Sequence, residues 1–221
     1  MSGPALIGAI TIGQSPRPDL VLPLRSRLPT DVAIIEIGAL DDLDEVDLPG
    51  PAHDGYPLTT RLRSGALVTV DDAFLAPRVQ AAVEQAERVG CSVSLLLCAG
   101  GFADLRSDRP LVRPFELAAA ALRSLGLERI VVVVPIDGQV APAARKWRAA
   151  GFVPTVLAAR LGEAPKVVAD ALPDQPVVLD FVGHPPGAVA HVRELVGRVV
   201  VDPADLAAAT LAAMMTSGTP R

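Results

Sequence analysis

The amino-acid sequence predicts an α/β protein made of two similar halves, each with a parallel sheet. Apolar segments of strand length alternate with helical segments, an order that is typical of βαβ units. The order of elements in the N-terminal half recurs in the C-terminal half. Half of the residues are apolar but only 3% are aromatic, so the core must consist mainly of Ala, Val, Leu and Ile, as in parallel strands covered by helices.

Seven apolar segments have the length expected of buried strands. Each is rich in Val, Ile or Leu, and most are followed by a segment with helical character. The expected strands are Ala5–Ile12, Val32–Ile37, Ser94–Cys98, Ile130–Val134, Phe152–Leu157, Val177–Leu179 and Arg198–Val201.

Capping residues mark the ends of several expected helices. Asp71 and Asp72 precede a helical stretch that stops at Gly90, a pattern typical of an N-cap and a helix-terminating glycine. Ser15 and Pro16 precede another, with proline near the first helical position. The expected helices are Arg17–Arg27, Asp71–Val89, Pro114–Leu125, Gln139–Ala150, Gly187–Val196 and Pro203–Met215.

The segment from Asp41 to Val70 interrupts this alternation and is expected to be an insertion. It begins with the acidic run DDLDEVDLPG and continues through turns rich in proline and glycine. Alternating residues on either side of Ser64-Gly65 predict a hairpin of Leu58–Arg63 with Ala66–Val70.

A weak internal repeat supports the two halves. A strand, a loop with Gly13-Gln14, a helix and a strand follow one another, and the same order recurs around Gly138-Gln139. Each copy is followed by a strand that ends in a glycine-containing loop, SLLLCAGGF and VVLDFVGHPPG. We expect the first half to comprise residues 1–110 and 204–221, with the hairpin near 58–70, and the second half residues 111–203. The halves are expected to face each other across an interdomain cleft, with ligand-binding loops at the carboxyl ends of the strands.

Charge and composition argue against several kinds of protein. The net charge is −5, no Lys/Arg stripe is present and aromatic residues are few, which argues against binding to nucleic acid. No apolar segment is long enough to cross a bilayer and no signal peptide is evident, so we expect a cytoplasmic protein without membrane contact. Two cysteines and three scattered histidines match neither a disulfide framework nor a metal-ligand spacing.

The stretches TIGQSPRPDL, YPLTTRLRSGALVTV and LLLCAGGF, with KW after a proline-containing loop, resemble the AroM family over most of the chain. This family is similar in fold to the aspartate/glutamate racemase superfamily. The resemblance implies two pseudo-symmetric α/β halves, with one cysteine from each half facing the other across the cleft. It further implies isomerase or lyase chemistry without a cofactor, a small-molecule carboxylate as ligand, and a fold compatible with a homodimer.

Cys98 is the candidate catalytic residue that this resemblance implies. Racemisation of an α-carbon needs a base on one face and an acid on the other, and cysteine can serve in both roles. Free cysteine is also commonly a small core residue, so a structural role stays open for Cys98, and Cys91 is interpreted as structural.

The second half departs from the pattern of the superfamily. A cysteine is expected after VVLD, where this sequence has Phe181, so a symmetric two-thiol mechanism is unavailable. His184 lies in the same loop and is the second candidate catalytic residue, because histidine commonly titrates near neutral pH. Asp180 is another candidate to replace the missing thiol, although the role we expect for it at the strand end is to accept hydrogen bonds from loop N–H groups.

Loops after the first strand of each half carry candidate substrate-binding residues. In one interpretation Ser15 caps the helix and Arg17 is solvated. In the other, which the recurrence of Gly-Gln favours, Ser15 and loop N–H groups hold a carboxylate at the helix N-terminus, with Arg17 adding a bidentate contact. Gln14 belongs to the same expected site, and Gln139 and Gly183 are the candidates from the second half.

Three further positions have two interpretations each. The N–H groups of Ala99, Gly100 and Gly101 are candidates for holding developing negative charge, although the two glycines are also explained by backbone freedom. Arg61, on the hairpin, is either solvated or brought to a substrate carboxylate. Trp147 is interpreted as helix packing rather than as a surface on which a ligand stacks.

Two functions therefore stay open. The first is an enzyme with the chemistry of the racemase superfamily, an isomerase or decarboxylase that uses a single thiol. The second is a non-catalytic small-molecule-binding or regulatory module that has lost the second thiol.

Overall fold

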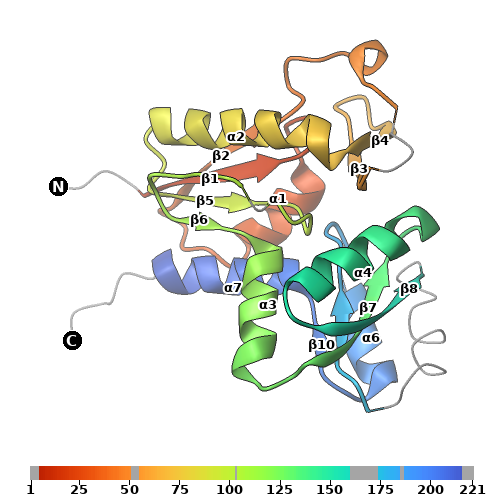
Figure 1. The fold of residues 1–221 in the computed structure, drawn as a ribbon. Coiled ribbons are helices and arrows are strands. Elements are labelled where there is room, and N and C mark those ends of the chain that lie inside the picture. Colours follow the sequence, from red (N-terminus) through yellow and green to blue (C-terminus); the bar gives the residue numbers. More distant parts are fainter. Residues whose placement is uncertain (1–4, 51–54, 103, 160–173, 185–186, 216–221) are drawn as a thin grey trace, which may run out of the picture. The chain divides into compact units, whose positions relative to one another are not determined.

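The chain forms two compact units in the computed structural model, which describes residues 5–50, 55–102, 104–159, 174–184 and 187–215. The first unit comprises Met1–Pro114 and Ala207–Arg221, and the second comprises Phe115–Leu206. Each unit has a four-stranded parallel sheet with helices around it, so the predicted α/β class is confirmed (Figure 1).

In the first unit the strand order is β2-β1-β5-β6, and every neighbouring pair is parallel. Helix α1 (Pro18–Arg25) connects β1 to β2, and α2 (Asp72–Arg88) precedes β5 and packs on β1 and β2 (Figure 1). Apolar side chains of α2 are buried against the sheet because they recur at helical spacing. The strands are β1 (Leu6–Thr11), β2 (Ala33–Gly38), β5 (Val93–Leu96) and β6 (Leu111–Val112).

In the second unit the strand order is β10-β9-β7-β8, again with parallel pairing throughout. Strand β7 is buried from Ile130 to Val134, and its sequence RIVVVV shows the continuous apolar run expected of a central parallel strand. The strands are β7 (Arg129–Val134), β8 (Val153–Ala158), β9 (Val177–Leu179) and β10 (Val200–Val201). The helices are α3 (Pro114–Ser124), α4 (Val140–Ala149) and α6 (Ala188–Val196), with a short 3-10 helix η2 (Asp137–Gln139) before α4. Helix α7 (Pro203–Met215) begins in the second unit and belongs to the first unit from Ala207 onward.

The two sheets have the same topology, as the internal repeat predicts. Read from β8, the second order is β8-β7-β9-β10, which matches β2-β1-β5-β6 strand for strand. Two hydrogen bonds give the residue-by-residue correspondence between the sheets: Leu97 N–H donates to Ile10 O at 2.7 Å, and Asp180 N–H donates to Val133 O at 2.9 Å. Leu97 and Asp180 are therefore equivalent, and so are the residues that follow them.

The Gly-Gln dipeptides occupy corresponding loops but not equivalent positions. Thr11 and Val134, which end β1 and β7, each accept a hydrogen bond from the residue that follows the neighbouring strand. Gln14 comes three residues after the first of these, whereas Gln139 comes five residues after the second, within η2. The expectation that the dipeptide recurs at a matching point is wrong, because the second loop has two additional residues.

The inserted hairpin is present as predicted. It pairs β3 (Pro57–Arg61) with β4 (Leu67–Asp71) in antiparallel register. Gly65 lies in the turn with φ of 91°, a backbone conformation that favours glycine. Gln14 N–H donates to Arg61 O, which holds the hairpin at the carboxyl edge of the first sheet (Figure 1).

Most element boundaries agree with those expected from the sequence. Each expected helix and strand is found within two residues at both ends. Strand β5 ends at Leu96, however, so Cys98 lies in the loop rather than in the strand. Strand β6 was not expected, because its two residues stand between Pro110 and Pro114 and lack a strand-length pattern. Across the described ranges, no helix combines the length and apolarity that a membrane crossing requires.

Candidate functional site

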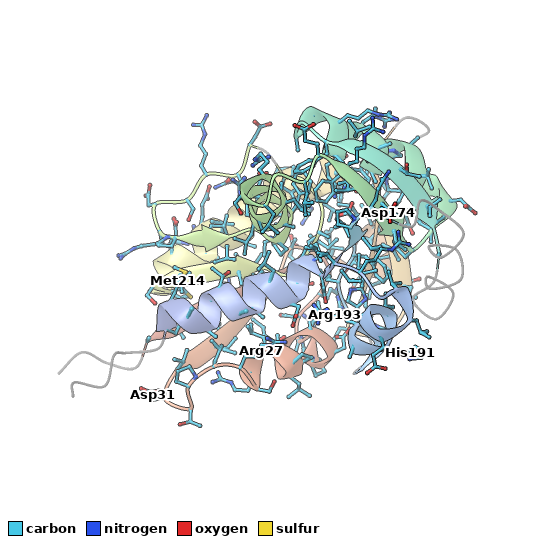
Figure 2. The ribbon with its side chains drawn as sticks, turned by 90° about the horizontal axis from the view of Figure 1, so that it is seen from below. Arg27, Asp31, Asp174, His191, Arg193 and Met214 are labelled. Atoms are coloured by element: carbon cyan, nitrogen blue, oxygen red, sulfur yellow. The ribbon has the colours of Figure 1, made fainter. Side chains whose placement is uncertain are left out.

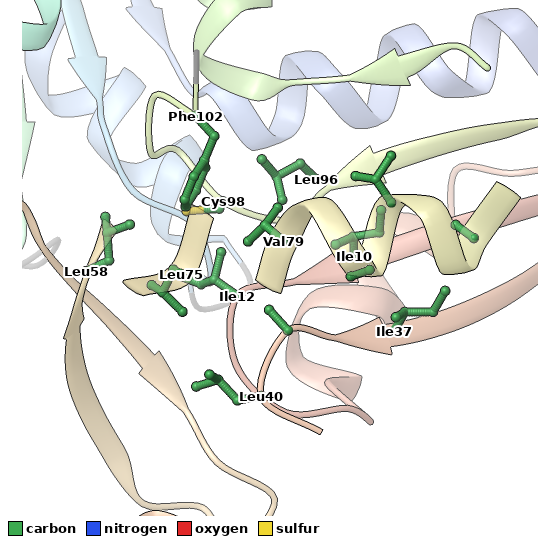
Figure 3. Packing of buried hydrophobic residues seen from close by; sticks show 14 of the residues in the cluster. Ile10, Ile12, Ile37, Leu40, Leu58, Leu75, Val79, Leu96, Cys98 and Phe102 are labelled. Atoms are coloured by element: carbon green, nitrogen blue, oxygen red, sulfur yellow. The ribbon is translucent and has the colours of Figure 1, made fainter. Parts of the chain in front are cut away.

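Cys98 lies two residues beyond the carboxyl end of β5 and is buried, with 4% of its surface exposed. Its sulfur accepts a hydrogen bond from Gly100 N–H at 3.2 Å. Phe102 and Leu58 belong to the same apolar cluster (Figure 3). A β-carbon on Gly100 would lie 3.2 Å from this sulfur and 3.1 Å from the Phe102 ring, so the loop wraps closely around the thiol. The N–H donor is suited to a sulfur that carries negative charge.

Cys91 provides a contrasting thiol in the same unit. It is 2% exposed and lies before β5, at the opposite end of that strand from Cys98. Burial raises the pKa of the Cys91 thiol. Its place in the apolar core matches the interpretation of Cys91 as structural.

Gln14 holds the loop after β1 in place through its side-chain amide. Its Nε2 donates to Leu40 O at 3.1 Å and to Leu43 O at 2.6 Å. Its Oε1 accepts from Arg63 N–H at 2.7 Å. The amide thus joins three chain segments, and its substrate-binding role stays a prediction.

Ser15 binds a carboxylate of the chain itself. Its N–H and Oγ each donate to Asp41 at 2.7 Å, and Gly38 N–H donates to the same carboxylate at 2.8 Å. Arg17, not Ser15, is the N-cap of α1, and the interpretation in which Ser15 caps the helix is wrong. The loop is therefore built to hold a carboxylate, and in this structure Asp41 supplies it.

Arg17 is buried rather than solvated, with 9% of its surface exposed. Its guanidinium makes a bidentate contact with Asp19, at 2.8 Å from Nε and 2.7 Å from Nη2. Nη1 lies 3.5 Å from the hydroxyls of Thr11 and Thr60. Arg17 lowers the pKa of the Asp19 carboxyl, chiefly through its hydrogen bonds.

The hairpin presents Thr60, not Arg61, to this cluster. Burial alternates along β3, so that Leu58 and Thr60 are buried while Thr59 and Arg61 are exposed. The Arg61 guanidinium donates to Gly65 O at 3.2 Å, within the hairpin. Sequence reasoning missed Thr60, although the two-residue period of the strand was a sufficient signal.

In the second unit, Phe181 occupies the position equivalent to Cys98, because it follows Asp180 as Cys98 follows Leu97. Gly183 is in turn equivalent to Gly100, but it has φ of 87° and requires glycine for a backbone reason. Of the other candidates, Ala99 and Gln139 are buried, and Gly101 and Gly183 are exposed at the surface of their loops. Their predicted roles toward a ligand stay predictions.

Asp180 belongs to a buried ion pair. Its carboxylate accepts hydrogen bonds from Lys146 Nζ at 2.9 Å and from Trp147 Nε1 at 2.9 Å, both on α4. The Lys146 and Asp180 side chains are 8% and 0% exposed. Burial raises the pKa of Asp180, and Lys146 opposes that rise. The expectation that Asp180 bonds loop N–H groups is wrong. The interpretation of Trp147 as a packing residue is confirmed by its edge contacts with Phe115 on α3 and with Phe152.

His184 lies near Asp202, a residue that sequence reasoning missed. Its Nε2 is 3.7 Å from Asp202 Oδ1, and the side chains of both residues are 6% exposed. The Phe181 ring meets the imidazole edge to face, with ring centroids 4.4 Å apart. Asp202 stands directly before Pro203 at the start of α7, a helix-start signal that could have indicated it.

Metal-ligating side chains do not gather in either unit: within the described ranges, no group of three or more His, Cys, Asp or Glu residues could hold a metal ion. The site residues instead form two loop clusters, one at the carboxyl edge of each sheet. Ligands bind at this edge in open parallel sheets.

The family model described as AroM protein matches residues 7–215. No curated protein sequence matches the chain.

Solved structures share the fold over nearly the whole chain. A Gly-to-Cys, Cys-to-Ser double mutant of arylmalonate decarboxylase in its liganded form has a TM-score of 0.66 at 19% identity, covering 98% of this chain and 94% of that chain. The maleate isomerase of Pseudomonas putida S16 has a TM-score of 0.61 at 14% identity, covering 95% and 92%. An aspartate racemase of Picrophilus torridus has a TM-score of 0.58 at 10% identity, covering 96% and 94%. At these identities the likeness establishes a shared fold, that of the Asp/Glu racemase-like proteins.

Proposed function

The chain belongs to the AroM family, and from this premise we propose that it is a cofactor-independent enzyme that acts on a small carboxylate, with Cys98 as its reacting group. The observation that carries the proposal is the position of Cys98. Its sulfur lies at the carboxyl edge of the first sheet and accepts the N–H of Gly100. Ligands bind at this edge of parallel sheets, and a thiol placed there can serve as a nucleophile or an acid/base group.

The fold relatives support a carboxylate as the ligand class. Arylmalonate, maleate and aspartate, which appear in their names, are all dicarboxylates. The loop after β1 in this chain already holds a carboxylate, that of Asp41, through Ser15 and Gly38. A ligand carboxylate has the same charge and acceptor geometry, so we propose that it replaces Asp41 on these donors. The cleft between the halves, expected from the sequence, stays a prediction.

The replacement of the second thiol by Phe181 limits the reaction type. In a decarboxylation, the bond to the leaving carboxylate breaks, CO2 departs, and its electron pair stays on the carbon as an enediolate. The Cys98 thiol then gives its proton to that carbon, and water reprotonates the thiolate. In an isomerisation, the thiolate instead adds to a carbon–carbon double bond, rotation follows, and the carbon–sulfur bond breaks again. Either reaction needs one thiol.

A non-catalytic binding module is the second candidate function. It is favoured by the burial of Cys98, which is 4% exposed within an apolar cluster, and by the aromatic ring at the equivalent position. In this alternative the cleft and its carboxylate donors persist without chemistry.

Turnover in deuterated water distinguishes the two functions. We expect the wild type to release CO2 from, isomerise, or incorporate deuterium into one member of a panel of malonates, maleate and amino dicarboxylates, followed by NMR. Cys98→Ser should lower the rate about 100-fold or more, while Cys91→Ser should retain it. Thermal stabilisation by a panel member without any turnover, retained in Cys98→Ala, would establish the binding module instead.

Labelling by iodoacetamide tests the thiol without a known substrate. We expect Cys98 to react faster than Cys91 at neutral pH, because a thiolate is the reactive form and an N–H donor stabilises it. Peptide mass spectrometry resolves the two sites in one sample, so Cys91 serves as the internal control. Equal and slow labelling of both cysteines would contradict a reactive Cys98.

A further inference from the structure

A cationic side chain supports the loop that carries Cys98. Arg113, which lies between β6 and α3, donates from Nη1 to Phe102 O at 3.3 Å. Both residues belong to the first unit, and residues 97–102 form neither helix nor strand. A guanidinium stays charged in proteins, and a charged donor makes a stronger hydrogen bond than a neutral one. The contact therefore ties an irregular segment to the end of the neighbouring strand.

The backbone on both sides of Arg113 is anchored. Val112 pairs with Leu95 in parallel register, so Arg113 lies at the carboxyl edge of the sheet, where the Cys98 loop begins. Pro114 begins α3 and restricts the residue before it to extended backbone. A strand and a helix thus set the position from which the guanidinium reaches the loop.

The second unit has the same arrangement with different residues. By the same strand register, Asp202 after β10 is the equivalent of Arg113 after β6. Each stands directly before the proline that begins a helix, α7 or α3. The Asp202 carboxylate lies 3.7 Å from the His184 imidazole, in the loop after β9. In both units the residue after the last strand therefore approaches the loop after the third strand of the sheet.

Phe102 connects this support to the thiol. Its ring is buried, with 6% of the residue exposed, in the apolar cluster around Cys98 (Figure 3). A β-carbon on Gly100 would lie 3.1 Å from a carbon of the Phe102 ring, so the ring rests against the Gly100 backbone. Gly100 N–H in turn donates to the Cys98 sulfur at 3.2 Å. Holding Phe102 O in place thus keeps this N–H directed at the sulfur.

Arg113 differs from two other arginines of the first unit in what it binds. Arg17 pairs with the Asp19 carboxylate, and Arg63 pairs with the Asp41 carboxylate. Arg113 donates instead to the main chain of the loop. It therefore constrains the backbone next to the thiol, which the two side-chain pairs do not contact.

We propose that Arg113 is a positioning residue for Cys98, which it serves by keeping Gly100 N–H on the sulfur. The inference rests on the proposed function, because it needs Cys98 as the reacting group. When the S–H bond breaks and the proton passes to the substrate carbon, the electron pair stays on the sulfur. Gly100 N–H stabilises this thiolate until water returns a proton, because a hydrogen bond to the charged form favours that form.

Four variants separate this role from a general loss of charge or packing. Arg113→Met removes the donor, and Arg113→Lys keeps a charged N–H donor at the same place. Arg109→Met is the matched control, because Arg109 is exposed just before β6 in the same unit. Arg193→Met removes an arginine on α6 of the second unit, where it pairs with Asp205 (Figure 2).

Hydrogen exchange of the Gly100 amide, followed in 1H–15N spectra, tests the support without a substrate. We expect this amide to exchange about tenfold faster in Arg113→Met, because its hydrogen bond to the sulfur weakens. Arg113→Lys should restore most of the protection, and both control variants should keep it. Gly90, which follows α2, is the internal control and should not change. Unchanged exchange of Gly100 in Arg113→Met would overturn the inference.

The pH profile of iodoacetamide labelling separates positioning from a mere loosening of the loop. The midpoint of the profile measures how readily the Cys98 thiolate forms, and the plateau at high pH measures access to the sulfur. We expect Arg113→Met to raise the midpoint by about 1 pH unit, a thiolate fraction about tenfold smaller at neutral pH. Arg113→Lys and the two controls should keep the wild-type midpoint. A changed plateau with an unchanged midpoint would overturn the inference.

Kinetics on a carboxylate that the wild type turns over complete the test. Arg113→Met should lower kcat about tenfold with KM within about twofold, because the support acts on the reacting group and not on ligand binding. Unchanged kcat in Arg113→Met would overturn the inference and leave the proposed function intact. A wild type without turnover, in which Cys98 labels no faster than Cys91, would overturn the proposed function and with it the role of Arg113 toward the thiol.

Discussion

The loops after β5 and β9 follow equivalent strands but have different chemistry. In the first, Cys98 is surrounded by apolar groups and accepts a backbone N–H. In the second, Phe181 replaces the thiol, the buried Asp180 carboxylate precedes it and the His184 imidazole contacts its ring. The comparison teaches that one topology can present a nucleophile at one sheet edge and titratable pairs at the other.

Two pairs of an aspartate with a cationic side chain show how burial decides the direction in which the pKa of the aspartate shifts. Asp19, 42% exposed in its side chain, has its pKa lowered by Arg17. Asp180, with no exposed side-chain surface, has its pKa raised by burial although Lys146 lies 2.8 Å away. Desolvation therefore exceeds attraction in the second pair and not in the first.

The largest loss of stability is expected from breaking the buried ion pair between Lys146 and Asp180. Lys146→Met leaves the Asp180 carboxylate buried without its counter-ion and should lower the free energy of unfolding by about 3–5 kcal/mol, measured by urea denaturation. The double variant Lys146→Met/Asp180→Asn should recover more than half of this loss, because asparagine still accepts from Trp147. A double variant as unstable as the single one would contradict the explanation.

The stability of Lys146→Met should depend on pH, and the direction of that dependence follows from the pKa of Asp180. Without Lys146, the pKa of Asp180 in the folded protein rises further above its ordinary value of 3.8. Between those two values the folded state binds more protons than the unfolded state, so stability falls as pH rises. Urea denaturation of Lys146→Met from pH 4 upward should show that fall, and a rise with pH would contradict it.

Substitution of the two equivalent glycines, Gly100 and Gly183, should lower the free energy of unfolding by less, and for a different reason at each position. Gly100→Ala places a methyl group 3.1–3.3 Å from Phe102, Cys98 and Leu58, and should cost about 1–3 kcal/mol through overpacking. Gly183→Ala should cost about 1–2 kcal/mol through its positive φ.

Asparagine serves as the diagnostic substitution at both glycines. It tolerates positive φ better than alanine but is larger. Asparagine should therefore be milder than alanine at Gly183 and worse at Gly100, again by urea denaturation. If the alanine and asparagine variants ranked the same way at both positions, glycine would not be required for different reasons at Gly100 and Gly183.

The smallest loss of stability is expected from breaking the partly exposed ion pair between Arg17 and Asp19. Asp19→Asn should cost under about 1 kcal/mol at pH 7, because solvent screens the contact with Arg17. Since folding lowers the pKa of Asp19, its contribution is present above about pH 4 and disappears as pH falls below 3.8. Urea denaturation should thus separate wild type and variant more at pH 7 than at pH 3.

Prediction from sequence succeeded for the fold because its signals are local. Strands such as RIVVVV and glycine-terminated helices such as Asp72–Arg88 are determined by composition and period over a few residues. The two-residue β6 and the offset between Gln14 and Gln139 were not predicted, because neither has a local pattern of its own.

Prediction of the candidate site was less complete because its partners are distant in the chain. Asp41 binds Ser15 across 26 positions, and no spacing rule links them. Thr60 could have been chosen over Arg61 from strand alternation alone. Asp202 could be identified as a helix start, but not as the carboxylate next to His184, since that contact depends on the pairing of β9 with β10.

The sequence by itself determined the two-half α/β fold and the single strand-end thiol, because hydrophobic period and the replacement of a cysteine by Phe181 are visible in the chain itself. Only the tertiary structure decided which carboxylates the loops hold and which groups share a sheet edge. The physical reason is that burial and distance, which set the opposite pKa shifts of Asp19 and Asp180, arise only when remote segments pack together.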